Sequence, residues 1–246
     1  MILRKWFILP AMAAVFILVA PVNAGWVMLE LDGNLTMISN GRLKGMSGEA
    51  SWIFYGPKNE MIFIKDSQKT YYRGTVDDYC ASTTAIYEKM LEDMPEEQRK
   101  KIAKENEPAA HKVAVVKTDD GATIAGFKTV KYRVLLDGKL FEEVWLTGDS
   151  GLMNDYKPLI PMLQKFNFCM SSMRIGFRPD KSPDYQKLLE TGFQLKSVKY
   201  GVGIPKPVTE VAKLEKTDLP DKQFEMPSDY RKHSIAQMMQ SQMDQQ

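Results

Sequence analysis

The side chains best suited to acid–base or metal chemistry are the two histidines of the sequence, His111 and His233. An imidazole serves as a general base or a zinc ligand where cysteines, carboxylates or further histidines stand at suitable spacing. His111 opens a strand-like run and His233 lies in the C-terminal tail, and neither has such neighbours. The sequence therefore predicts no catalytic residue, no metal site and no cofactor.

Two pairs of adjacent acids have structural explanations. Asp77-Asp78 falls at the start of a predicted helix, where carboxylates are favoured, and Asp119-Asp120 precedes a glycine in a turn. Neither a G-x-S-x-G motif nor a glycine-rich phosphate loop occurs, and Gly201-Val202-Gly203 has no helical pattern behind it. An enzyme would need a cleft that these local patterns do not disclose, so it ranks last among the functions considered.

The two cysteines, Cys80 and Cys169, lie among apolar neighbours on predicted helices. In an exported protein an even number of cysteines is compatible with a disulfide, but free cysteine is also a common buried side chain. The sequence leaves both alternatives open.

A β-hairpin over residues 128–148 is the most strongly predicted element. Asp137-Gly138 separates two alternating runs, and both residues tolerate the positive φ angles of a two-residue hairpin turn. That turn would place Val134 opposite Phe141 and Val130 opposite Trp145 on an apolar face, while Arg133 and Glu142 would share the solvated face.

The apolar face either fills an ordinary core or lines a cavity for an acyl chain. In the second interpretation a predicted helix at about residues 76–94 supplies the opposite wall. The candidate ligand-binding residues are then Val130, Tyr132, Val134, Leu136, Phe141 and Trp145 on the sheet and Tyr79, Tyr87, Met90 and Met94 on the helix.

The first residues are typical of a secretory signal peptide. Arg4 and Lys5 precede an apolar run, and small residues stand before Gly25. The run is shorter than the roughly 20 residues of a membrane span, and prolines interrupt it, which favours cleavage after Ala24 over an uncleaved anchor. We therefore expect a periplasmic protein with no integral membrane span once residues 1–24 are removed.

Charge gives no indication of a nucleic-acid partner. The chain has 33 basic and 31 acidic residues, and the two basic residues of the signal region account for the whole difference. Lysine-rich stretches such as Arg99–Lys101 alternate with glutamates, which is typical of a solvated helix rather than of a basic binding surface.

The order of predicted elements favours one α+β domain. A meander of short strands fills residues 26–74, two helices follow to about residue 107, and further strands enclose helices at 156–173 and 183–191. This order predicts a curved antiparallel sheet with helices covering one face. The Gln- and Met-rich tail, residues 231–246, is expected to be disordered.

Four segments resemble an uncharacterised family of exported bacterial proteins known as a domain of unknown function, itself similar to LolA-like periplasmic lipoprotein carriers. They are EMIFIKDSQKTYYRGTVDDY (60–79), GFKTVKYRVLLDGKLFEEVWLTGD (126–149), DYQKLLETGFQLKS (184–197) and FEMPSDYRK (224–232). The resemblance implies an open, strongly curved half-barrel over residues 25–230, with helices on a concave apolar face that accepts lipid. It brings no catalytic residues.

Two functions follow as expectations. The first is an envelope protein that binds a lipid or lipidated protein in an apolar cavity between sheet and helices. The second is a non-enzymatic interaction or regulatory module on the same scaffold, with a filled core.

Overall fold

The computed structural model of the chain describes residues 24–107, 111–173, 177–200 and 208–238. Six short antiparallel strands open it and pair in sequence order. They are β1 (Ala24–Glu30), β2 (Leu35–Ser39), β3 (Arg42–Ser47), β4 (Ala50–Tyr55), β5 (Glu60–Lys65) and β6 (Thr70–Thr75). Asp32 and Gly33 lie in the turn that joins β1 to β2, and β3 was not predicted as a separate strand. Its turn residues, Asn40 and Gly41, both have positive φ angles of 51° and 69°.

Two helices follow β6 directly: α1 (Val76–Glu92) and α2 (Glu96–Glu105). A capping box opens α1, because Thr75 accepts a hydrogen bond from the Asp78 amide and the Asp78 carboxylate accepts one from the Thr75 amide. Pro95 stands at the N-cap of α2, with acidic residues in the first turn and Lys104 in the last, matching the helix dipole.

The second half of the chain completes the sheet. Its elements are β7 (Val113–Ile124), β8 (Phe127–Leu136), β9 (Lys139–Thr147), α3 (Ser150–Tyr156), α4 (Ile160–Ser172), α5 (Pro183–Thr191), β10 (Phe193–Lys199), β11 (Val208–Asp218) and β12 (Arg231–Lys232). The strand order is β12-β6-β5-β4-β3-β2-β1-β11-β10-β9-β8-β7, and within the described strands only the β12–β6 pair is parallel. The sheet is therefore large, mostly antiparallel and unclosed, as expected for a single α+β domain.

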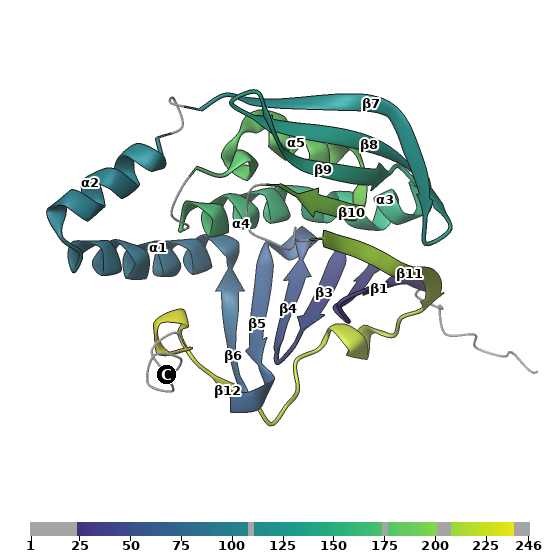
Figure 1. Cartoon of the computed structure of the whole chain (residues 1–246). Coiled ribbons are helices and arrows are strands. Elements are labelled where there is room, and N and C mark those ends of the chain that lie inside the picture. The colour runs from purple at the N-terminus through teal and green to yellow at the C-terminus, as the bar shows by residue number, and fades with distance from the viewer. Residues whose placement is uncertain (1–23, 108–110, 174–176, 201–207, 239–246) are drawn as a thin grey trace, which may run out of the picture.

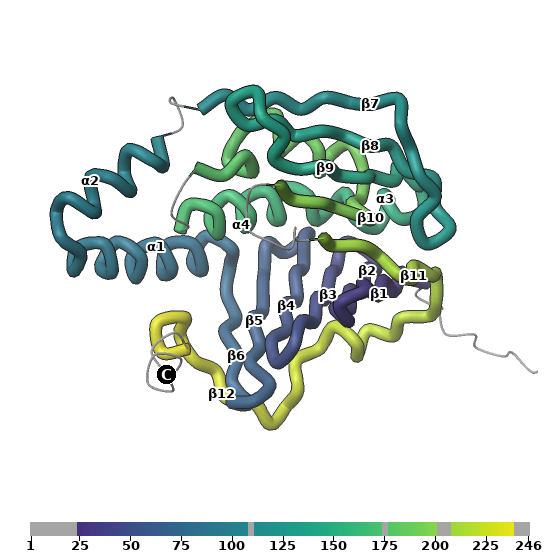
Figure 2. Tube along the Cα trace, in the orientation of Figure 1, coloured from purple at the N-terminus to yellow at the C-terminus, as the bar shows by residue number. Residues whose placement is uncertain are grey.

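Strong curvature brings the two halves of this sheet to face different directions, and α3 and α4 lie along the concave side between them (Figure 1). α1 continues from the end of β6 away from the sheet, and α2 turns back beside it (Figure 2). α1 and α4 are joined by a disulfide between Cys80 and Cys169, whose Cα atoms are 5.7 Å apart.

The main core lies between the concave face and these helices. It includes Phe54 and Met61 from the sheet and Leu152 and Leu159 from the helical layer, each at most 4% exposed. Aromatic rings extend it, since Phe166 of α4 lies 5.3 Å from Trp52 and 5.2 Å from Phe54 between ring centroids. The described helices thus cover much of the concave face with packed apolar side chains.

The C-terminal segment wraps the convex face of β1–β6. Phe224 is 1% exposed against Ile53 and Ile62, and the Arg42 guanidinium lies 4.6 Å from the centre of its ring. Beyond it, β12 pairs with β6, while Ile235 and Met238 are buried in the main core. The structure thus differs from the expected disorder at residues 231–238, because apolar side chains three residues apart have a surface to bury against.

The predicted signal peptide lies outside the described residues except for Ala24, which pairs with Asp218 at the start of β1. Within the described ranges, none of the helices has both the length and the hydropathy needed to cross a bilayer.

Candidate functional site

The predicted hairpin forms β8 and β9, but its register differs from the expected one. Asp137 and Gly138 make the turn with φ angles of 52° and 77°, and Leu136 pairs with Lys139. A bulge at Phe141 then shifts β9 by one residue. Val134 therefore lies opposite Glu142 rather than Phe141, and Val130 lies opposite Leu146 rather than Trp145, because one extra residue reverses the facing of every later side chain.

The bulge separates the predicted sheet-side residues. Val134 is fully buried, and Tyr132 packs with it against Leu188 of α5, so this face is covered by a helix. Trp145 pairs with Lys131 on the opposite face, where the ammonium groups of Lys131 and Lys196 lie 5.1 and 5.4 Å from its ring centre. Phe141 lies beside the Arg178 guanidinium, and Val130 and Leu136 are half-buried.

The helix-side candidates do not meet this hairpin face. Tyr79 belongs to the main core, where its ring contacts Trp52 and Phe166, and the burial raises the pKa of its hydroxyl to about 12. Tyr87 and Met90 lie further along α1, and Met94 lies just past its end. Tyr87 and Met94 are half-buried, and Met90 is 45% exposed. The ten predicted residues therefore do not form one cavity wall.

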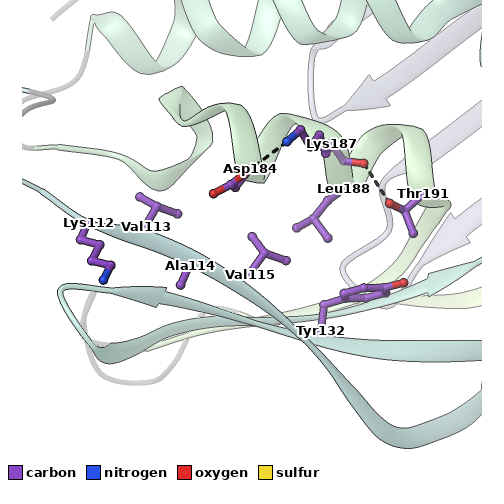
Figure 3. Close-up of a pocket in the computed structure, with 9 residues that line it drawn as sticks. All are labelled: Lys112, Val113, Ala114, Val115, Tyr132, Asp184, Lys187, Leu188 and Thr191. Carbon is purple, nitrogen blue, oxygen red and sulfur yellow. Dashed lines mark hydrogen bonds and ion pairs between the residues drawn. The ribbon is translucent and has the colours of Figure 1, made fainter.

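A different hollow lies between strands β7 and β8 and helix α5 (Figure 3). It is an open cavity of about 500 Å³, lined by Lys112, Val113, Ala114, Val115, Tyr132, Asp184, Lys187, Leu188 and Thr191. Val113 and Val115 point toward the helix, and Leu188 points back toward the strands (Figure 3). Asp184, Lys187, Leu188 and Thr191 line it together because residues three and four apart share one face of a helix.

A second cavity of about 320 Å³ continues the first past the start of β7. It shares Lys112, Val113 and Asp184 with the first cavity and adds His111, Phe177, Lys181, Ser182 and Pro183. The His111 ring stacks on Phe177 with centroids 4.7 Å apart. We call the two cavities together the β7–α5 groove.

β7 is the last strand of the sheet, so one of its edges has no partner among the described strands. The pairing with β8 is regular from Val113 to Lys117 and shifts between Lys117 and Gly121, where Asp119 and Asp120 interrupt it. Charges and bulges of this kind discourage an edge strand from pairing with strands of unrelated chains. The edge therefore has two stretches of regular strand geometry, 113–117 and 121–124, and the first of them borders the groove.

Local interactions hold both walls of the groove. The Asp137 carboxylate accepts a hydrogen bond from the Lys112 amide at 2.8 Å and pairs with His111 Nδ1 at 2.9 Å, and these contacts lower the pKa of Asp137. On the other side, Ser182 caps α5 by accepting a hydrogen bond from the Tyr185 amide, and Pro183 occupies the first turn.

A buried acid fastens α5 to the sheet. The Tyr185 hydroxyl donates to Glu142 Oε2 at 2.9 Å, and Glu142 is only 2% exposed. Burial raises the pKa of Glu142, although the charge of Lys199 and hydrogen bonds from Tyr185 and Ser197 oppose the shift. Burial beside Glu142 likewise raises the pKa of Tyr185. The bulge at Phe141 is the cause of this arrangement, because it turns Glu142 inward.

Replacement of Glu142 by Gln tests the anchor. A raised folded pKa means that burial stabilises the protonated form, so this contribution to stability is complete below the unfolded value of 4.5 and is lost as pH rises through the folded pKa. The glutamine side chain keeps an oxygen for Tyr185 and carries no charge. We expect urea denaturation to show E142Q at least as stable as wild type at about pH 7.5, with a smaller advantage at about pH 4.5. Equal destabilisation at both pH values would contradict this.

The groove is net positive. Its lining contains three lysines and one aspartate, and Lys187 lies 3.4 Å from that aspartate, Asp184. Burial lowers the pKa of Lys181, although the nearby Asp180 opposes the shift. Among the described residues no group of three or more His, Cys, Asp or Glu side chains has the arrangement of a metal site. The groove thus combines an apolar floor with basic edges.

Sequence reasoning missed this site. The alternation Val113, Val115, Lys117 and the helical spacing of Asp184, Leu188 and Thr191 were both visible. What could not be read from either pattern is that β7 becomes an edge strand and that α5 packs beside it.

Comparisons with known proteins give a family and a remote structural likeness. A model of the family described as "Domain of unknown function (DUF4412)" matches residues 37–230. A search of curated proteins found no match. The structure of PNGF-II in space group C2 gives a TM-score of 0.43 at 11% identity, covering 88% of this chain and 32% of that chain. The P21 form gives 0.41 at 12% identity, with 89% and 32% covered, so the chain spans about a third of those chains.

Proposed function

The chain belongs to the DUF4412 family, a domain of unknown function, and from the β7–α5 groove we propose that it is a non-enzymatic interaction module that binds an extended segment of another protein. The segment would lie beside β7 as an added strand, with alternate side chains directed into the groove. This is the second of the two functions expected from the sequence, and the geometry of the groove supports it.

The observation that supports this proposal is the combination of a free strand edge and a helix standing beside it. An added strand gains affinity from main-chain hydrogen bonds to the edge, and its alternate side chains gain specificity from pockets beneath. Residues 113–117 offer about 16 Å of regular edge, at about 3.3 Å per residue. Val113, Val115 and Leu188 supply the apolar floor, and the lysines of the rim favour an acidic ligand.

The N-terminal segment favours a partner in the cell envelope. If residues 1–24 act as a cleaved signal peptide, the module works in the periplasm and meets exported or membrane-anchored proteins there. The Cys80–Cys169 disulfide is compatible with such an oxidising compartment.

A second candidate is the lipid or lipoprotein carrier expected first from the sequence. The apolar floor and lysine rim of the groove would also suit an acyl chain with an anionic head group. The fold would then be a LolA-like half-barrel that binds its lipid in the β7–α5 groove instead of on the concave face of the sheet. The packed side chains on the concave face favour the groove over the originally expected cavity.

Selection from a phage-displayed library of random dodecapeptides, followed by hydrogen exchange, separates the two candidates. We expect synthetic copies of the selected peptides to slow amide exchange within residues 113–117, because strand addition pairs those amides. A fluorescent fatty-acid probe serves as the comparison ligand. If the fatty-acid probe binds and can be displaced, and no selected peptide protects β7 from exchange, the carrier is favoured and the module is contradicted.

A further inference from the structure

We infer that the bound segment joins β7 as an antiparallel strand, in which the residues that exchange main-chain hydrogen bonds with β7 also place their side chains in the groove. The inference rests on the proposed function and names the chemistry of its ligand. That ligand is an extended segment with two aliphatic residues at alternate positions, neither of them proline. The evidence is the direction in which each main-chain group of β7 points.

Hydrogen bonds at the start of β7 show which main-chain groups point toward β8. The Asp137 amide, in the turn after β8, donates to the carbonyl of Lys112 at 2.8 Å, and the Lys112 amide donates to the Asp137 carboxylate at 2.8 Å. Both main-chain groups of Lys112 are therefore used on the β8 side. In an antiparallel ladder successive residues of one strand direct their main-chain groups alternately to one side and to the other.

This alternation continues along the regular stretch of β7. Ala114 and Val116 bond to β8, so the N–H and C=O groups of Val113 and Val115 point to the open edge, where the described strands offer no partner. The side chains of Val113 and Val115 point toward α5 (Figure 3), and Val116 is 45% exposed on the other face. The two valines of the apolar floor are thus also the residues that offer main-chain groups to a ligand.

The short length of the regular edge favours the antiparallel direction. In an antiparallel pair one ligand residue exchanges both hydrogen bonds with the edge residue opposite, so ligand residues opposite Val113, Val115 and Lys117 suffice. In a parallel pair each edge residue bonds to the two ligand residues that flank the opposite one, so the ligand must extend past both ends of this stretch. Beyond Lys117 the ladder shifts, and Asp119 and Asp120 interrupt it.

The antiparallel register determines which ligand side chains enter the groove. Residues directly opposite each other in a sheet place their side chains on the same face. The ligand residues opposite Val113 and Val115 therefore face α5 over a floor that includes Leu188, which suits valine, isoleucine or leucine. Proline at either position would remove a main-chain donor. Lys117 is exposed, so the ligand residue opposite it is expected to tolerate polar side chains.

An N-methyl scan of a dodecapeptide selected on the wild-type protein tests this register. N-methylation removes one main-chain donor and keeps the side chain. We expect it to weaken binding at least about tenfold at the ligand residues that face the groove, and to have little effect at the residues between them.

An alanine scan of the same peptide identifies the groove-facing residues independently. Replacement of the ligand residue opposite Val115 should weaken binding to wild type and weaken it less in V115A, because the two side chains are in contact. V116A is the matched control, and it should leave every loss unchanged because Val116 lies on the other face of β7.

Hydrogen exchange separates failure of the register from failure of the module. Strand addition in either direction should slow exchange at the amides of Val113, Val115 and Lys117. If these amides are protected but N-methylation acts at the residues between the groove-facing ones, the added strand is parallel and the inference is overturned, while the module remains. Protection without sensitivity to any N-methylation would overturn it as well. If no selected peptide protects these amides, the module and the inference fail together.

Discussion

A glutamate at position 115 is expected to weaken peptide binding by roughly a hundredfold, whereas a glutamate at position 116 should leave it intact. Val115 faces the groove and packs against the cluster of Val134 and Leu188, while Val116 is 45% exposed on the opposite face of the same strand. V115E would place a carboxylate on the apolar floor, where it has no partner once a ligand excludes water. A free-energy penalty of about 3 kcal/mol for burying this carboxylate on ligand binding corresponds to roughly a hundredfold weaker binding.

Fluorescence anisotropy with a labelled selected peptide measures this difference. V116E carries the same charge one residue away, so it controls for electrostatic repulsion of an acidic ligand. Because Val115 is also part of a packed cluster, V115T provides a milder variant that keeps the branched shape, and it should weaken binding by less than V115E. Normal binding by a folded V115E protein, or equal losses in V115E and V116E, would remove the groove from the proposed function.

Local chemistry accounts for the parts of the fold that the sequence predicted well. Asp137-Gly138 defines a tight turn, Thr75 and Asp78 define a helix start, and both depend only on residues close together in the chain. The missed strand β3 was also within reach of such rules. Asn40-Gly41 is among the strongest hairpin-turn sequences, and it joins β2 to β3 as those rules require.

The features that failed depend on contacts between distant segments. No local rule places a bulge at Phe141, yet that bulge moves Trp145 to the strand face opposite Val134 and turns Glu142 toward Tyr185 of α5. The groove has the same origin, because an edge strand is defined by the order of all the strands, and α5 approaches β7 from a distant part of the sequence. The expected ligand face was consequently assigned to a surface that a helix covers.

Loss of the disulfide is expected to be the largest single change in stability. Cys80 and Cys169 are 89 residues apart, and the bond closes a loop that contains α2, the strands β7–β9 and α3. The chain-entropy relation assigns a closed loop of this length about 4.5 kcal/mol, and measured effects of removing native disulfides are commonly about 2–5 kcal/mol. The bond joins α1 to α4, and an exposed ion pair of Lys165 with Asp77 links the same two helices.

We expect C80A/C169A to lower the free energy of unfolding in urea by about 2–4 kcal/mol, and wild type with both cysteines reduced to unfold at the same urea concentration as the variant. The ion pair offers a matched comparison, because K165Q removes a non-covalent link between α1 and α4 and should cost less than about 1 kcal/mol at an exposed site.

If closure of the loop is the cause, peptide binding at the groove should survive under conditions where the variant remains folded, since β7 and α5 keep their mutual contacts. A change below about 0.5 kcal/mol would mean that packing of α4 against Trp52 and Phe54, rather than the covalent bond, holds the helical layer on the sheet.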